Sequence, residues 1–159
     1  MAVKILIFNL FFILICFNAV SSGKTIFGKA KVIDGDTIHI YKNKIRLHAI
    51  DAPETNQTCN KNNKVWNCGI ESTKFLKKLI GKNKIECITT GKDQYNRFIG
   101  ICYKNNLDLN SEMVLNGWAI AYRYYSMDYV EEEEVAKQQK KGVWSGEFEE
   151  PYLFRKKNK

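Results

Sequence analysis

Short segments that mix or alternate apolar and polar residues dominate the chain between positions 25 and 103. They are rich in Ile, Val, Thr or Phe and are separated by Gly, Asn and Asp, which is the pattern of half-buried strands. The last two segments flank the polar connection 90–97, which predicts a hairpin. The five predicted strands cover residues 25–33, 37–41, 45–50, 84–89 and 98–103.

Three other segments, 69–80, 107–116 and 130–141, are predicted to be helices, and in the first of them apolar residues can share one helix face. Gly81 directly follows the first of them, and glycine is a common helix stop. The third segment has its acids first and its lysines last, the order that the helix dipole favours. Its run of glutamates, 131–134, is expected to be a solvated helix start.

The order of these elements is three strands, a helix, two strands and two helices, which is typical of a small closed barrel of the OB type. We therefore predict an α+β fold that is mainly a five-stranded OB-fold barrel, with three α-helices. The predicted domain covers residues 23–145, and residues 146–159 are expected to form a frayed, soluble basic tail. Such barrels often bind nucleic acid, although a fold alone does not establish a function.

Residues 1–22 do not follow the barrel pattern and are expected to be a signal peptide. Lys4 precedes an apolar run that is short for a membrane span, and small residues follow that run. Cleavage is expected after Ser22 or after Ala19, and an uncleaved anchor is the alternative. A lipoprotein signal at Cys16 is disfavoured because the residue before it is bulky. We expect an exported protein, secreted or periplasmic, with membrane attachment only if the N-terminus stays uncleaved.

Removal of the first 22 residues would leave four cysteines, an even number that fits disulfide bonds in an exported protein. We favour Cys59–Cys68, which would close a short polar loop, and Cys87–Cys102, which would join the arms of the predicted hairpin. Free buried thiols are the alternative. No C-x-x-C pair is present, so a zinc site is not expected.

The chain carries 25 Lys and Arg against 17 Asp and Glu, a net charge of +8. A basic balance favours an acidic partner, most commonly nucleic acid. Anionic membranes or simple solubility would explain the same charge, so composition alone does not decide between them. The chain has only two histidines, His39 and His48, which disfavours a mechanism built on a catalytic histidine pair.

Acidic and basic residues gather at the ends of the predicted strands. Asp36 stands at the start of the second strand, directly after an Asp-Gly turn. Asp51 and Glu54 lie at the end of the third strand, which also carries Arg46, and Arg97 ends the hairpin loop. Hydrolysis of a phosphodiester needs this mixture, because oxygen ligands hold a hard cation and a spare carboxylate takes a proton from water. Two arginines would bind the phosphate oxygens.

Taken in order, these motifs resemble the staphylococcal (micrococcal) nuclease family, also called thermonucleases. The resemblance extends from about Thr25 to Trp144, essentially the whole predicted domain. Each motif alone is weak, but the ordered set is specific. The motifs are Val32-Ile33-Asp34-Gly35-Asp36-Thr37-Ile38, Ile45-Arg46-Leu47, Ile50-Asp51-Ala52-Pro53-Glu54-Thr55 and Asp93-Gln94-Tyr95-Asn96-Arg97.

The resemblance implies a calcium-dependent nuclease. Its metal ligands would be Asp36, Asp51 and the main-chain carbonyl of Ala52, and Glu54 would orient or deprotonate the attacking water. The scissile phosphate would be bound by Arg46 and Arg97.

The resemblance also implies the substrate and the products. Members of the family cut DNA and RNA between phosphorus and the 5′ oxygen, which leaves 3′-phosphate ends. The nucleotide pocket would be lined by Tyr95, Tyr122 and Tyr124. We expect a monomer without a stable protein partner.

The sequence departs from the best-known family member at several positions. Ala52 stands where that protein has Thr, but only the carbonyl is needed there. Gln94 stands where a Lys contacts a terminal phosphate, so weaker affinity for such ends is expected. The Asn-rich loop 56–67, which contains Cys59 and directly precedes Cys68, is longer, and we expect a stapled surface loop rather than a rim of the substrate groove.

Two other functions compete with the enzyme hypothesis. A catalytically inactive, exported nucleic-acid-binding OB module would be expected to lack a catalytic carboxylate or arginine. This chain has all five of these residues, Asp36, Arg46, Asp51, Glu54 and Arg97. A cell-envelope interaction protein that uses a basic barrel surface would show no effect of calcium on stability and no cleavage of nucleic acid.

Overall fold

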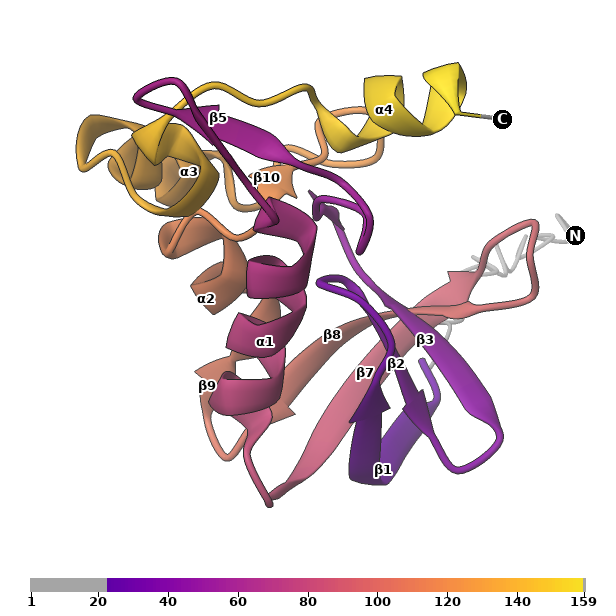
Figure 1. Cartoon of the computed structure of the whole chain (residues 1–159). Coiled ribbons are helices and arrows are strands. Elements are labelled where there is room, and N and C mark those ends of the chain that lie inside the picture. Colours follow the sequence, from indigo (N-terminus) through magenta and orange to yellow (C-terminus); the bar gives the residue numbers. More distant parts are fainter. Residues whose placement is uncertain (1–22, 159) are drawn as a thin grey trace, which may run out of the picture.

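The computed structural model describes residues 23–158 and shows a closed five-stranded barrel (Figure 1). Neighbouring strands are antiparallel in the order β3-β2-β1-β7-β8, and a parallel pairing of β3 with β8 closes the barrel. The predicted α+β fold with an OB-type barrel is therefore confirmed. The barrel strands are β1 (Thr25–Val32), β2 (Thr37–Ile40), β3 (Asn43–Leu47), β7 (Lys84–Lys92) and β8 (Phe98–Lys104).

Apolar residues that alternate along these strands fill the barrel. Ile26, Ile38 and Ile45, from three neighbouring strands, are each at most 4% exposed. Removing this surface from water is the main stabilising contribution to the fold. Because side chains alternate across a strand, burial of Ile45 and Leu47 turns Arg46 between them to the other face.

The described residues contain four α-helices where three were predicted. Local signals explain where they begin and end. The Asp108 carboxylate accepts the backbone N–H groups of Asn110 and Ser111 and so caps α2, and Gly81, at φ 61°, ends α1. The helices are α1 (Cys68–Ile80), α2 (Leu109–Leu115), α3 (Val130–Gln138) and α4 (Pro151–Lys157), with a 3-10 turn η1 (Gly142–Ser145).

The strand predicted over residues 45–50 is broken in the structure. β3 ends at Leu47, and Ala49 has φ 56°, a left-handed conformation that is uncommon for a residue other than glycine. The chain then continues as β4 (Ile50–Asp51), which pairs with β10 (Ile120–Ala121). The break therefore turns Asp51 out of the barrel sheet and beside the segment that follows α2.

The predicted polar loop 56–67 contains a small hairpin. Asn62 and Asn63 both have positive φ values, as the tight two-residue turn of a hairpin requires. We call this element the stapled hairpin, because a disulfide joins it to α1. The stapled hairpin consists of β5 (Cys59–Lys61) and β6 (Lys64–Trp66). Elsewhere in the fold, a further short strand, β9 (Leu107–Asp108), pairs with β8.

Both predicted disulfides are confirmed. Cys59 at the start of β5 is bonded to Cys68 at the start of α1. Cys87 and Cys102 are bonded and lie directly opposite each other in the β7–β8 pair. Disulfide bonds persist in oxidising compartments, so the pair indicates that the protein works in one.

The C-terminal segment is an ordered helix, which corrects the expectation of a frayed tail. Pro151 begins α4, a position that proline favours because its missing N–H would have no partner there. Gln57 donates a hydrogen bond to the carbonyl of Glu149, 92 positions away. Such distant contacts leave no periodic signal in the sequence. In Figure 1, α4 lies beyond the end of the barrel strands, on the side of β10.

Within residues 23–158, no helix has the length and apolar character needed to cross a membrane. The expected signal peptide, residues 1–22, lies outside the described residues.

Candidate active site

The turn before β2 places a carboxylate at the end of the barrel. Asp34 Oδ1 accepts the backbone N–H of Asp36 at 3.0 Å, a local bond typical of Asp in turns. A Cβ on Gly35 would overlap Ser72 Oγ and the Cβ of Ala52, so only glycine lets the turn pack this closely. Asp36 is 5% exposed, and its Oδ2 accepts the N–H of Ala52 at 2.7 Å.

Arg46 joins two buried carboxylates. Its guanidinium pairs with Asp36 through Nη1, and its Nη2 lies 2.8 Å from Oδ1 of Asp51. Asp51 is fully buried. Burial lowers the pKa of Arg46, and the charge of Asp51 acts in the opposite direction. Because the pKa of arginine is ordinarily far above neutrality, the guanidinium stays charged and neutralises its partners.

Glu54 sits on a segment whose backbone is fixed. The Gln57 N–H donates to the Glu54 carbonyl at 2.7 Å, and Gln57 Oε1 accepts the Glu54 N–H at 3.2 Å. A Cβ on Gly69, at the start of α1, would overlap the Glu54 carbonyl oxygen, so the helix abuts this segment. The Glu54 side chain nevertheless remains 32% exposed. The structure thus brings the predicted Glu54 and Asp51 to one place, each bonded to the same guanidinium of Arg155.

That third arginine, Arg155 of α4, was missed in the sequence. Its Nη1 and Nη2 lie 2.8 and 3.0 Å from the two carboxylate oxygens of Asp51, and Nη1 lies 2.9 Å from Oε1 of Glu54. Burial acts to lower the pKa of Arg155, but the hydrogen bonds and charges of Asp51 and Glu54 outweigh burial and raise it. The only sequence signal was the basic run at the chain's end, which is also typical of a solvated tail.

Arg97 lies at the base of the β7–β8 loop. Its backbone N–H and its Nε are hydrogen-bonded to the carboxylate of Asp93, at 2.9 and 2.7 Å. The exposed ring of Tyr95 faces the guanidinium, 5.5 Å from it. Burial raises the pKa of Asp34, and the charges of Arg46 and Arg97 both oppose this rise. The charge of Arg97 also lowers the pKa of Arg46. Arg97 is therefore within electrostatic reach of the cluster formed by Asp36, Arg46, Asp51, Glu54 and Arg155, while its own ion pair is with Asp93.

Three neighbouring tyrosines follow β10, and the first is half-buried while the other two are exposed. Tyr122 follows β10, where its N–H donates to the Ala49 carbonyl at 2.8 Å. Burial raises the pKa of Tyr122 and the charge of Asp51 raises it further, so this phenol is within electrostatic reach of Asp51. Its ring centroid is 6.2 Å from that of Tyr124 and 5.1 Å from that of Tyr125, which was not predicted. Tyr124 is 82% exposed.

The donor set of the cluster fits a hard divalent cation. Asp36 and Asp51 place buried carboxylate oxygens on either side of the Arg46 guanidinium. The space between the two carboxylates therefore favours a positively charged group. Oxygen ligands of this kind are those that calcium prefers. In the described part of the chain, no group of three or more His, Cys, Asp or Glu side chains is arranged to hold a metal ion. A cation here would therefore also need main-chain or solvent oxygens.

Fold and site together define a class of protein, a five-stranded OB-type barrel with an acidic and arginine-rich cluster at the end of its strands. The family described as staphylococcal nuclease homologue matches residues 44–146. This chain belongs to the staphylococcal nuclease family, which confirms the resemblance seen in the sequence motifs.

Relatives of this chain occur in several bacteria. An uncharacterized endonuclease of Haemophilus influenzae is 33% identical over 149 residues, which cover 89% of this chain and 79% of that protein. A micrococcal nuclease of Shigella flexneri is 29% identical over 147 residues, 81% of this chain and 79% of that protein. The succinoglycan biosynthesis protein ExoI of Rhizobium meliloti is 32% identical over 127 residues, 77% of this chain and 66% of that protein. Family membership supports a nuclease function.

Proposed function

We propose that this protein is a calcium-dependent nuclease that hydrolyses phosphodiester bonds of DNA and RNA and leaves 3′-phosphate ends. The observation that carries the proposal is the convergence of three carboxylates, Asp36, Asp51 and Glu54, on the guanidinium groups at one end of the barrel. Family membership and the net charge of +8 support the same substrate class.

Glu54 is the carboxylate suited to act on water. Its side chain is 32% exposed, whereas the side chains of Asp36 and Asp51 are 7% and 0% exposed. A partly exposed carboxylate can reach an attacking water and accept its proton, a role that typically contributes about 10²–10⁴-fold to a rate. Glu54 would orient this water for attack on the phosphorus.

Arg46 and Arg97 would bind the phosphate. A guanidinium presents a planar fork of donors that matches two phosphate oxygens. Its hydrogen bonds to phosphate are strongest where water is excluded. Arg46 is 13% exposed and is held by its carboxylate partners, so its donors are positioned before substrate arrives. Arg97 is more exposed and would complete the clamp from the β7–β8 loop.

Asp36, Asp51 and the carbonyl of Ala52 would hold the calcium ion, which when bound would neutralise phosphate charge. Oδ2 of Asp51 accepts one hydrogen bond, from Arg155, so its second lone pair would serve the ion. Asp36 is prepared for this role because its Oδ2 accepts the N–H of Ala52, which fixes the carboxylate beside that stretch of main chain.

The exposed rings beside the cluster would contact the bases. Stacking on aromatic rings tolerates every base, because each base has a π-face, and so suits both DNA and RNA. Tyr122 and Tyr124 would form one platform, and Tyr95 would contribute from the β7–β8 loop. Since all these residues come from one chain, the site needs no partner subunit, and we propose a monomer. We also infer export, which the two disulfides support.

Cleavage of denatured DNA, measured with calcium and then with excess chelator, tests the proposal. A matched pair of variants sharpens it, Glu54→Gln in the cluster and Glu86→Gln at an exposed position of β7. We expect calcium-dependent cleavage with 3′-phosphate ends for the wild type and for Glu86→Gln, and a loss of several orders of magnitude for Glu54→Gln. A folded wild type that binds DNA without cleaving it would instead identify an inactive nucleic-acid-binding module.

A further inference from the structure

The segment 146–150 is fixed on the stapled hairpin before α4 begins. The Asn60 N–H donates to the Glu147 carbonyl at 2.8 Å, and the Glu147 N–H donates to the Asn60 carbonyl at 2.7 Å. A Cβ on Gly146 would overlap the Asn60 carbonyl oxygen, so the two backbones pack closely here. The segment is thus joined to the hairpin by a pair of backbone hydrogen bonds.

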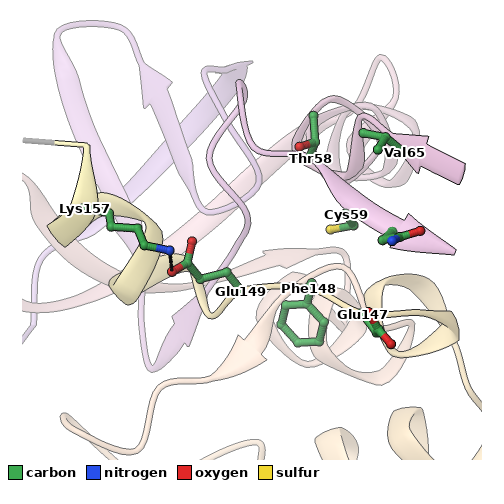
Figure 2. A pocket seen from close by; sticks show the side chains of 8 residues that line it. Thr58, Cys59, Val65, Glu147, Phe148, Glu149 and Lys157 are labelled. Atoms are coloured by element: carbon green, nitrogen blue, oxygen red, sulfur yellow. Dashed lines mark hydrogen bonds and ion pairs between the residues drawn. The ribbon is translucent and has the colours of Figure 1, made fainter. Parts of the chain in front are cut away.

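Side chains strengthen this attachment. Gln57 is fully buried and donates to the Glu149 carbonyl at 2.6 Å. Phe148 packs against the apolar cluster that contains the Cys59–Cys68 disulfide. Figure 2 shows where the segment meets the stapled hairpin, and it also shows the ion pair between Lys157 of α4 and the Glu149 carboxylate. These contacts fix the segment 146–150 and therefore set the direction in which α4 begins. We call this attachment of residues 146–150 to the stapled hairpin and Gln57 the dock.

From this dock, α4 carries Arg155 to two carboxylates at once. The guanidinium spans both oxygens of Asp51 and one oxygen of Glu54. Arginine has a rigid planar fork of donors, which can hold two carboxylates in a fixed relation, whereas the single ammonium of lysine cannot. In the portion of the chain that the structure describes, the other hydrogen bonds of Glu54 are made by its backbone with Gln57, so Arg155 is what fixes its carboxylate.

We propose that Arg155 is a positioning residue of the nuclease site, which holds the Glu54 carboxylate in a fixed relation to Asp51. The stapled hairpin delivers it by docking the segment before α4. This inference rests on the proposed function, because Arg155 acts on the reaction through Glu54 and not through contact with the phosphate.

Three variants of the full chain test the proposal, Arg155→Ala, Arg155→Lys and the control Lys156→Ala. Lys156 is exposed on the same helix and carries the same charge. With denatured DNA and saturating calcium, we expect Arg155→Ala to lower kcat about 10- to 100-fold, the usual effect of removing a residue that orients a functional group. KM should stay within about twofold, since no substrate contact is lost. Arg155→Lys should recover little, and Lys156→Ala should match the wild type.

Side-chain NMR of the metal-free protein gives a readout that does not depend on activity. Gln57 holds the backbone of Glu54 in every variant, whereas Arg155 bonds its carboxylate. We therefore expect the Glu54 side chain to keep one rotamer in the wild type and in Lys156→Ala, and to average between rotamers in Arg155→Ala. If the wild type cleaves nothing, the proposed function fails, and the Glu54 rotamer still tests the positioning role.

Several results would overturn this role. A single Glu54 rotamer retained in Arg155→Ala, or an unchanged kcat, would show that Arg155 does not hold the Glu54 carboxylate. A rise in KM alone would make Arg155 a phosphate contact. Faster cleavage by Arg155→Ala at low calcium would make it a competitor of the cation.

Discussion

The cluster is assembled from two regions that differ in how they are held. Asp36, Arg46 and Asp51 come from strand ends of the barrel and are almost completely buried. Arg155 comes from a short terminal helix that the stapled hairpin attaches, and its side chain is 31% exposed. The barrel region is fixed by closure of a sheet, whereas the tail region is fixed by a few hydrogen bonds and one disulfide.

Asp36, Arg46 and Asp51 are therefore positioned by the barrel itself, whereas Arg155 is positioned by a helix attached to the outside of the barrel. Local opening has a low free energy where buried contacts are few, so we expect the tail region to open more readily than the barrel. Loss of the tail should therefore reduce the proposed activity without unfolding the barrel, while damage to the barrel should remove both.

After Glu54→Gln, the largest expected effect concerns Arg97, which lies on the β7–β8 loop at the edge of the barrel region. Arg97→Ala should lower kcat/KM about 10²–10³-fold, as loss of a donor to transition-state charge typically does. The fold should be retained, because the partners of Arg97 among residues 23–158, Asp93 and Tyr95, lie on the same loop. Steady-state cleavage and a circular dichroism spectrum check this, and wild-type rates would refute the assigned role.

The two disulfides give the next contrast. Replacing Cys87 and Cys102 by alanine should lower the free energy of unfolding by about 3 kcal/mol, the value that chain entropy suggests for a loop of this size. Replacing Cys59 and Cys68 should cost less, about 2.5 kcal/mol, and should also make the tail sensitive to limited proteolysis. Denaturant unfolding and protease digestion separate the effects, and a protease-resistant tail in the second variant would show that the dock does not depend on its disulfide.

A smaller effect is expected at Glu133 of α3. This buried carboxylate bonds Arg123, Lys137 and the backbone of Ala121. Burial acts to raise the pKa of Glu133, but these hydrogen bonds together lower it. A lowered folded-state pKa contributes stability above the ordinary value of about 4.5 that is lost as pH falls through the lowered value.

Glu133→Gln should therefore cost about 2 kcal/mol at neutral pH, and the difference from wild type should shrink as the solution is acidified below that value. Unfolding by urea at several pH values measures it, and a difference that does not change with pH would contradict the ion-pair account.

The smallest effect is expected at the exposed aromatic platform. Tyr124→Ala should raise KM a few-fold and leave kcat unchanged, since loss of one stacked base costs about 1 kcal/mol or somewhat more. An unchanged KM would exclude Tyr124 from the substrate surface.

Sequence patterns predicted the barrel region well, because its signals are local. Period-two alternation gave the five strands, and Asp36, Arg46 and Asp51 belong to short motifs at their ends. The break at Ala49 was not predicted, because it depends on pairing with a strand far along the chain.

The tail region escaped prediction for the same physical reason. The contacts of Arg155 with Asp51 and Glu54 span more than a hundred positions, 104 and 101 respectively. Glu133, in a run of four glutamates expected to be solvated, is instead buried. Its partners Arg123 and Lys137 are near in sequence, but the run of identical residues does not show which glutamate faces them. A charged residue whose partners are not apparent from the sequence is predicted to be solvent-exposed.

Whether the two regions form one catalytic unit is tested most directly by a double-mutant cycle of Glu54→Gln and Arg155→Ala, with kcat as the readout. If Arg155 acts through Glu54, the double variant should cleave no more slowly than Glu54→Gln alone, within about threefold. Losses that multiply in the double variant would contradict the account, because they would show that Arg155 acts on the reaction independently of Glu54.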